Sequence, residues 1–194
     1  MTSSGQFVQV ISEETLSRRV AELGADIAAE YPEGDFVAIA ILNGSLMFMK
    51  DLMDHLPLTV TPDFLKLTRF GHDGRVSVAM DASVPLVDRD VLIVLDIVDT
   101  GLTLTTIMKM MEARGARSVR TAALLDKVPR RIIEVDIHHR GFEVGDEYLL
   151  GYGLDYEGLY RNVPTIWAVL DMVAFTENPQ SFQTVAFERP AEDQ

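Results

Sequence analysis

One segment, residues 91–105, constrains the fold of this chain more than any other. It reads Val-Leu-Ile-Val-Leu-Asp-Ile-Val-Asp-Thr-Gly-Leu-Thr-Leu-Thr. The apolar, β-branched run 91–95 is typical of a strand that is covered on both faces of a parallel sheet. A helix is predicted at 101–113, with Gly115 as its stop. The loop between them therefore lies at the carboxyl end of a strand, where open α/β sheets bind ligands.

The rest of the chain alternates between helical and extended patterns. Ser12 is a predicted N-cap, and the four apolar residues Leu16, Val20, Leu23 and Ile27 recur at helical spacing. The predicted helices are 12–30 and 46–56, and the predicted strands are 36–42, 60–68, 119–125, 132–137, 148–150 and 166–170. A turn cluster at 70–74, between extended runs at 65–69 and 76–80, predicts an antiparallel excursion or a flap. The alternation predicts an α/β fold: an open, mainly parallel twisted sheet with helices on both faces.

Composition limits the classes of function. The 194 residues favour one domain, 1–194, with a polar, loosely held tail from 177 to 194. A net charge of −13 argues against a nucleic-acid or anionic-membrane partner. There is no cysteine, and the four histidines lack metal-ligand spacing. No apolar run approaches the roughly 18 residues of a membrane span, and no secretory signal is evident, so we predict a cytoplasmic protein.

The loop after residue 95 carries the residue types of a phosphate site. Thr100, Gly101 and Thr103 stand where a helix begins, and the free backbone N–H groups there bind anions. Asp96 and Asp99 place carboxylates beside them. This combination favours a phosphorylated ligand that carries a divalent metal and hydroxyl groups, although an ordinary N-capped helix would use the same residues.

This segment resembles the phosphoribosyl diphosphate (PRPP) signature of type I phosphoribosyltransferases. That signature has four apolar residues, two acids, two apolar residues, Asp-Thr-Gly and then a hydroxyl residue. The chain departs from it at Leu95, which replaces the first acid. The resemblance implies a small hood and a flexible flap beside the sheet, and Mg²⁺ as cofactor. It also implies that Asp96 holds the ribose hydroxyls, directly or through the metal.

Further roles follow from the same resemblance. Asp99 matches the residue that acts as general base or acid toward the purine. Thr100, Gly101, Leu102 and Thr103 match the loop that holds the 5′-phosphate through hydroxyl and backbone N–H groups. Helix capping remains the alternative explanation for these residues.

Two more loops resemble parts of the family's diphosphate site. Leu42-Asn43-Gly44-Ser45 resembles the family's Leu-Lys-Gly-Gly or Leu-Lys-Gly-Ser loop, with Asn43 where a lysine is common. Asn43 and Gly44 are therefore candidate diphosphate contacts. Arg69, in Arg69-Phe-Gly71, begins the expected flap, which would close over the diphosphate and exclude water. A plain strand-to-helix turn and an ordinary hairpin are the alternatives.

The downstream half resembles the hypoxanthine-guanine phosphoribosyltransferases within this family. The resemblance is carried by Leu124-Leu-Asp-Lys127, by Gly141-Phe-Glu-Val-Gly-Asp146 and by Leu150-Gly-Tyr-Gly-Leu-Asp-Tyr156 with Tyr160-Arg-Asn-Val-Pro164. It implies that Lys127 donates to the purine 6-oxo group, which would select oxopurines over adenine. It also implies a second metal ligand at Asp146 and a diphosphate contact at Arg161. A lysine at a strand end is otherwise usually just solvated.

The position of the purine-stacking pair departs from the family pattern. Where an aromatic and an aliphatic residue usually precede Gly-Phe-Glu, this chain has His139 and Arg140. We expect the His139 ring to stack on the purine and the Arg140 backbone to contact it, but His138-His139-Arg140 can equally form a solvated loop.

The leading interpretation is a purine-salvage enzyme that transfers phosphoribosyl from PRPP to hypoxanthine or guanine and releases diphosphate. Leu95 and Asn43 motivate an alternative: a PRPP- or nucleotide-binding regulator on the same fold with little catalysis. A third interpretation keeps the enzyme and changes the base to xanthine. The resemblance further implies a homo-oligomer, a dimer or a tetramer.

Overall fold

The structure is a computed structural model that describes residues 5–70 and 75–187. Two compact units are formed, and we describe each by itself. The larger unit runs from Ser17 to Asp146, and the smaller combines the described residues up to Leu16 with those from Glu147 onward. The prediction that the whole chain is one domain stays a prediction.

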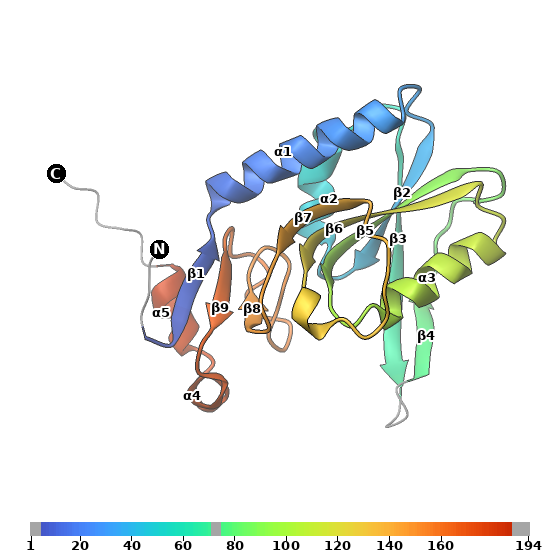
Figure 1. The fold of residues 1–194 in the computed structure, drawn as a ribbon. Coiled ribbons are helices and arrows are strands. Elements are labelled where there is room, and N and C mark those ends of the chain that lie inside the picture. Colours follow the sequence, from blue (N-terminus) through green and yellow to red (C-terminus); the bar gives the residue numbers. More distant parts are fainter. Residues whose placement is uncertain (1–4, 71–74, 188–194) are drawn as a thin grey trace. The chain divides into compact units, whose positions relative to one another are not determined.

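A six-stranded sheet forms the centre of the larger unit (Figure 1). In spatial order its strands are β4 (Arg75–Met80), β3 (Thr61–Phe70), β2 (Phe36–Leu42), β5 (Asp90–Val98), β6 (Ser118–Asp126) and β7 (His139–Glu143). All neighbours are parallel except β3 and β4, which pair antiparallel. The predicted α/β class, the mainly parallel sheet and the antiparallel excursion are confirmed. The predicted turn itself, residues 71–74, lies outside the described residues.

Side chains alternate between the two faces along each strand, and residues on both faces of the central strands are buried. Ile39 and Ile93 share a core cluster with Leu104, Ile107 and Met111 of α3 (Leu102–Ala113). The intervening strand residues, among them Phe36, Ala38, Leu92 and Val94, are also fully buried. In Figure 1, α3 covers one face, whereas α1 (Glu13–Glu30) and α2 (Leu46–Met53) lie on the other.

The start of α1 agrees with the sequence prediction. The hydroxyl of Ser12 accepts a hydrogen bond from the amide of Thr15 at 3.2 Å, so Ser12 is the N-cap. The four predicted apolar residues from Leu16 to Ile27 are all buried. Helix α2 ends at Met53, three residues before the predicted end at Leu56. Within the described residues, no helix is long and apolar enough to span a membrane.

The smaller unit contains an antiparallel sheet in the order β1 (Phe7–Ile11), β9 (Ile166–Val169) and β8 (Tyr148–Leu150). Strand β1 was not predicted. Two short helices, α4 (Met172–Glu177) and α5 (Ser181–Ala186), follow β9. Phe182 of α5 is fully buried and packs on Phe7 and Trp167. Within the predicted loose tail, 177–194, helix α5 thus contributes a buried side chain to this core, and the prediction for the tail as a whole stays a prediction.

The predicted strand at 132–137 is absent from the structure. The amides of Ile132 and Ile133 instead donate to the carbonyl oxygen of Thr100, both at 3.0 Å. The sixth strand is β7, from His139 to Glu143, in a stretch where a loop was the alternative to a base-binding segment. The β-branched residues at the start of this run therefore form hydrogen bonds with a loop that is distant in the sequence, and not with a neighbouring strand.

Candidate active site

The candidate site lies at the carboxyl ends of three adjacent strands, β2, β5 and β6. From β2 the chain continues through α2 to β3 on one side, and from β5 it continues through α3 to β6 on the other. The direction of winding therefore changes between β2 and β5. Such a topological switch point opens a crevice in which α/β proteins bind ligands.

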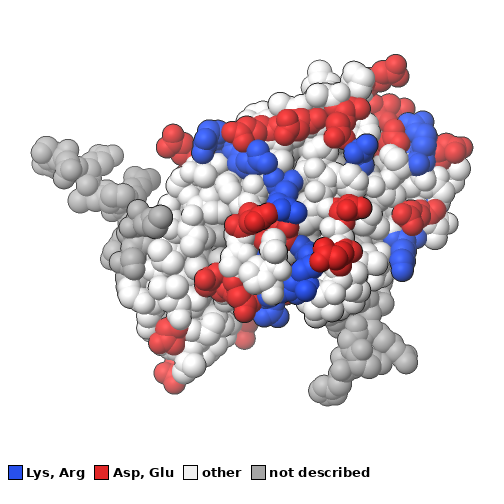
Figure 2. Space-filling view, viewed as in Figure 1, with Lys and Arg blue, Asp and Glu red and all other residues white. Residues whose placement is uncertain are grey.

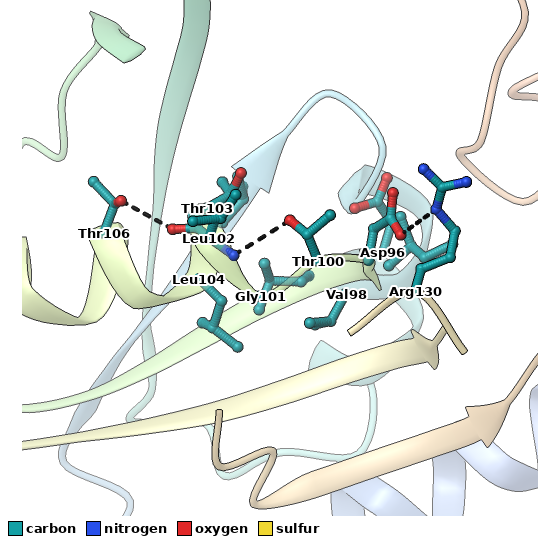
Figure 3. A pocket seen from close by; sticks show the side chains of 13 residues that line it. Asp96, Val98, Thr100, Gly101, Leu102, Thr103, Leu104, Thr106 and Arg130 are labelled. Carbon is teal, nitrogen blue, oxygen red and sulfur yellow. Dashed lines mark hydrogen bonds and ion pairs between the residues drawn. The ribbon is translucent and has the colours of Figure 1, made fainter. Parts of the chain in front are cut away.

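A pocket of about 740 Å³ opens at this edge of the sheet. Most of its lining comes from one continuous segment of the chain, the end of β5 and the start of α3. The lining residues are Ile41, Leu95, Asp96, Ile97, Val98, Asp99, Thr100, Gly101, Leu102, Thr103, Leu104, Thr106 and Arg130. Figure 3 shows Asp96 and Arg130 together at one end, and Thr103 and Thr106 on α3 at the other.

Backbone geometry makes the loop at Gly101 a cradle. Gly101 has a φ of 87°, and a Cβ atom there would lie 2.4 Å from the carbonyl oxygen of Ile133. Only glycine adopts this conformation and fits this space without strain. The Thr100 hydroxyl accepts a long hydrogen bond of 3.4 Å from the amide of Leu102 (Figure 3). The four residues predicted to hold a phosphate, 100–103, all line the pocket.

The predicted diphosphate loop lies directly against Asp96. A Cβ atom at Gly44 would come within 1.6 Å of the Asp96 Oδ2 atom, so the carboxylate rests on the glycine backbone. Asn43 is exposed, and the peptide bond between Leu42 and Asn43 is cis. The structure therefore brings the loop at Asn43 and Gly44 against Asp96 near the end of β5, about fifty residues further along the sequence.

An arginine that the sequence reading missed contacts the predicted catalytic carboxylate. Arg130 Nε donates to Asp99 Oδ1 at 2.9 Å, and Arg130 Nη1 contacts Asp146 Oδ1 at 3.2 Å. The hydrogen bond to Asp146 and the charge of Asp99 raise the pKa of Arg130 further above its usual value. The signal for Arg130 was the pair Arg130-Arg131, which begins three residues after Lys127 in a chain with a net charge of −13.

Lys127 stands immediately after β6, at the same edge of the sheet. Its amide donates to the carbonyl oxygen of Val98 at 2.9 Å, which ties the end of β6 to the end of β5. Its Nζ atom lies 3.5 Å from the carbonyl oxygen of Asp146. Lys127 thus follows the strand next to residues 98–103, the predicted phosphate loop, as a base-recognising lysine would need to.

The predicted stacking pair lies elsewhere. His139 is paired with Ala122, four residues before the end of β6, and its side chain is only 4% exposed. Its Nε2 atom is 3.5 Å from a carboxylate oxygen of Glu30 in α1, and burial lowers its pKa. The Arg140 carbonyl oxygen accepts a hydrogen bond from Arg19 at 2.7 Å. The buried ring and the bonded carbonyl give no support to the stacking and backbone roles, which stay predictions.

Three further predicted site residues are Arg69, Arg161 and Asp146. Arg69 lies in β3 opposite Val76. Arg161 belongs to the smaller unit, where it donates to the carbonyl oxygen of Gly153 at 2.5 Å and pairs with Asp155 at 2.6 Å. Asp146 pairs with Arg130, and its role as a metal ligand stays a prediction.

Leu95, at the position of the family's first acid, belongs to the core. Its side chain is 4% exposed, clusters with Ile93 and Leu104, and also borders the pocket. The substitution Leu95→Glu places a carboxylate among apolar side chains. We expect it to lower the free energy of unfolding by about 3 kcal/mol or more, because a carboxylate that is buried among apolar side chains loses its hydration.

Urea denaturation measures this change. Leu95→Met is the matched control, since it conserves volume and polarity and is expected to cost less than about 1.5 kcal/mol. Equal stability of the Glu variant and the parent protein would show that the carboxylate reaches water or a ligand in the pocket.

The surface agrees with the acidic composition. Figure 2 shows a row of acidic side chains along α1 and a smaller basic group below it. The exposed acids of α1 include Glu13, Glu14, Glu22 and Asp26. This face offers no continuous basic stripe of the kind that binds a nucleic-acid backbone.

The fold and this pocket define an α/β protein with an open pocket at a switch point of a mainly parallel sheet. Comparison with known proteins narrows the class. The phosphoribosyl transferase domain family matches residues 10–157. The hypoxanthine-guanine phosphoribosyltransferase of Bacillus subtilis (strain 168) is 38% identical over 161 residues, which are 81% of this chain and 89% of that protein.

Solved structures agree. A hypoxanthine phosphoribosyltransferase from Staphylococcus aureus superimposes with a TM-score of 0.81 at 34% identity, over 89% of this chain and 99% of that one. A Trypanosoma cruzi hypoxanthine phosphoribosyl transferase gives a TM-score of 0.83 at 28% identity, over 92% and 99% of the two chains. The chain belongs to the phosphoribosyltransferase family, within its hypoxanthine-guanine branch.

Proposed function

We propose that this protein transfers the phosphoribosyl group of PRPP to a 6-oxopurine, hypoxanthine or guanine, and releases diphosphate. The observation that carries the proposal is the pocket at the switch point. One continuous segment there combines a helix-start cradle, residues 100–103, with two carboxylates, Asp96 and Asp99. The names and similarity of the relatives support the same reaction.

The cradle binds the 5′-phosphate of PRPP. Backbone N–H groups at the start of α3 and the hydroxyls of Thr100 and Thr103 supply donors to a dianionic group. Asp96, between the cradle and Gly44, accepts hydrogen bonds from the ribose hydroxyls. Leu95 contributes no such acceptor, so the chain relies on Asp96 at this position.

The site suits Mg²⁺ on the chemistry of its donors. Magnesium prefers oxygen ligands and commonly binds one or two carboxylates together with substrate phosphates and water. Asp96 offers such a carboxylate beside the pocket, whereas Asp146 would first have to release Arg130. When bound, the metal would neutralise charge on the diphosphate as it departs.

Asp99 manages the purine proton, and Lys127 recognises the purine 6-oxo group. A carboxylate at the rim of the pocket can take a proton from the base as the bond to ribose forms. Arg130 Nε donates to Asp99 and keeps one of its oxygens oriented. The loose, cationic ribosyl transition state is stabilised by Asp96 and by fixed positioning of both substrates.

The direct test is the formation of IMP from hypoxanthine and PRPP in the presence of Mg²⁺. Chromatography measures the nucleotide, and a separate assay detects the released diphosphate. We expect product with hypoxanthine or guanine and none after chelation of the metal. Adenine is the matched control base and is expected to be the worst substrate, because a lysine donor favours a carbonyl over an amine.

The same assay discriminates the alternatives. Intact PRPP binding without product would favour a regulator on this fold, which the exposed Asn43 and the buried Leu95 motivate. Preference for xanthine in a competition among the four purines would change the base and keep the enzyme. Diphosphate contacts of Arg69 and Arg161, homo-oligomeric assembly and a cytoplasmic location remain predictions.

A further inference from the structure

The segment after β6, residues 127–133, donates hydrogen bonds to the backbone carbonyl groups of the phosphate loop. Three consecutive carbonyl oxygens of the loop accept hydrogen bonds from this segment. The bonds run from Lys127 N to Val98 O (2.9 Å), from Arg131 Nη1 to Asp99 O (2.8 Å), and from Ile132 N and Ile133 N to Thr100 O (3.0 Å each). The carbonyls are thereby turned toward the 127–133 segment.

Peptide geometry fixes where the adjoining N–H groups point. In a planar trans peptide, the carbonyl of one residue and the N–H of the next point in opposite directions. The N–H groups of Thr100 and Gly101 therefore point away from the 127–133 segment. The pocket is lined by residues 95–104 and, from that segment, by Arg130. The backbone N–H donors that a phosphate needs are thus already oriented by the protein before any ligand binds.

Among these donors, Arg131 is the one that uses its side chain. That side chain is held in place by a buried carboxylate. Its side chain is 10% exposed and pairs through Nη2 with Asp126, whose side chain is 2% exposed. The other Asp126 oxygen lies 3.0 Å from Arg140 Nε. A buried ion pair with several hydrogen bonds has a single preferred geometry. One nitrogen of Arg131 is therefore fixed by Asp126 while another holds the Asp99 carbonyl.

We propose that Arg131, anchored by Asp126, is a positioning residue that pre-forms the phosphate cradle by holding the Asp99–Thr100 peptide. The inference rests on the proposed function for the identity of the ligand, the 5′-phosphate of PRPP. Donors that are already oriented stabilise an anion without reorganisation. The contribution belongs to binding of the phosphorylated substrate and not to binding of the purine.

The test is Arg131→Lys. Lysine keeps a cation beside Asp126, but its single nitrogen lacks the planar fork that joins Asp126 to the Asp99 carbonyl. We expect the KM for PRPP to rise about tenfold, equivalent to about 1.4 kcal/mol. The KM for hypoxanthine is expected to stay unchanged. The affinity for ribose 5-phosphate, measured by calorimetry without turnover, is expected to fall by the same factor.

Asp126→Asn is a second variant, which leaves Arg131 in place beside a neutral acceptor. It is expected to raise the KM for PRPP by a smaller factor, and it decides the matter if Arg131→Lys fails to fold. Arg117→Met is the matched control, because Arg117 pairs with Asp90 between the same two strands at their amino ends. This control is expected to leave both KM values unchanged.

Unchanged affinity for PRPP and ribose 5-phosphate in the folded variants would overturn the inference. An equal rise of both KM values together with a lower Tm would also overturn it, since that indicates a purely structural role. If the parent protein forms no IMP but Arg131→Lys still weakens ribose 5-phosphate binding, the proposed reaction fails and the positioning role stands.

Discussion

Replacement of Asp99 by asparagine is expected to lower turnover by about 10²- to 10⁴-fold, the usual contribution of a positioned acid or base. The amide keeps an oxygen that can accept the Arg130 Nε–H now bonded at 2.9 Å, so the local structure is retained. It cannot take a proton from the purine. Steady-state kinetics with varied PRPP are expected to show a KM for PRPP close to that of the parent protein.

Asp81→Asn is the control for this variant. Asp81 also pairs with an arginine, Arg114, at 2.6 Å, and it is not among the residues that line the pocket. Its loss is expected to leave turnover unchanged, since exposed ion pairs contribute little. Normal turnover in Asp99→Asn would remove Asp99 from the proposed mechanism.

The parts of the fold that the sequence predicts well are those that local pattern determines. The β5–α3 segment was found because a buried strand, a glycine with positive φ and a helix start each leave a distinct local signature. Strand β5 extends to Val98 and so includes Asp96, but the order of elements is as predicted. The phosphate loop and its two carboxylates followed from that order.

The features of the structure that the sequence did not predict depend on contacts between distant segments. Residues 132–137 have the composition of a strand, yet Ile132 and Ile133 bond to Thr100 of the phosphate loop. His139 was assigned to the base because of its place before Gly-Phe-Glu. In the structure it lies under α1 near Glu30, a contact that no local pattern reveals.

The basic residues of the site also show that contacts between distant segments cannot be predicted from local sequence. Lys127 was found through a motif, but Arg130 and Arg131 were not. Their roles depend on Asp99 and Asp126, which lie at the ends of two different strands. Two consecutive arginines in an acidic chain are a detectable signal, but the sequence does not say which carboxylates they meet.

Gly44→Ala is expected to weaken PRPP binding while the protein remains folded. The added Cβ atom would lie 1.6 Å from Asp96 Oδ2 and 2.5 Å from Asp96 Cγ, so the carboxylate must move. It is the flexible end of a side chain, so the sheet need not shift. If Asp96 contributes a charge-assisted hydrogen bond of about 1.5–3 kcal/mol, its displacement raises the KM for PRPP by about 10- to 100-fold.

A double-mutant cycle shows whether the effect of Gly44→Ala acts through Asp96. Gly44→Ala and Asp96→Ala are each expected to weaken PRPP binding, whereas Gly44→Ala made in the Asp96→Ala background is expected to add little, because no carboxylate remains to be displaced. PRPP affinity measured by calorimetry for the four proteins gives the coupling. Additive losses would mean that Gly44 acts through the diphosphate loop itself, for example by letting its backbone approach the substrate. Thermal unfolding of the same proteins separates both outcomes from a general loss of structure.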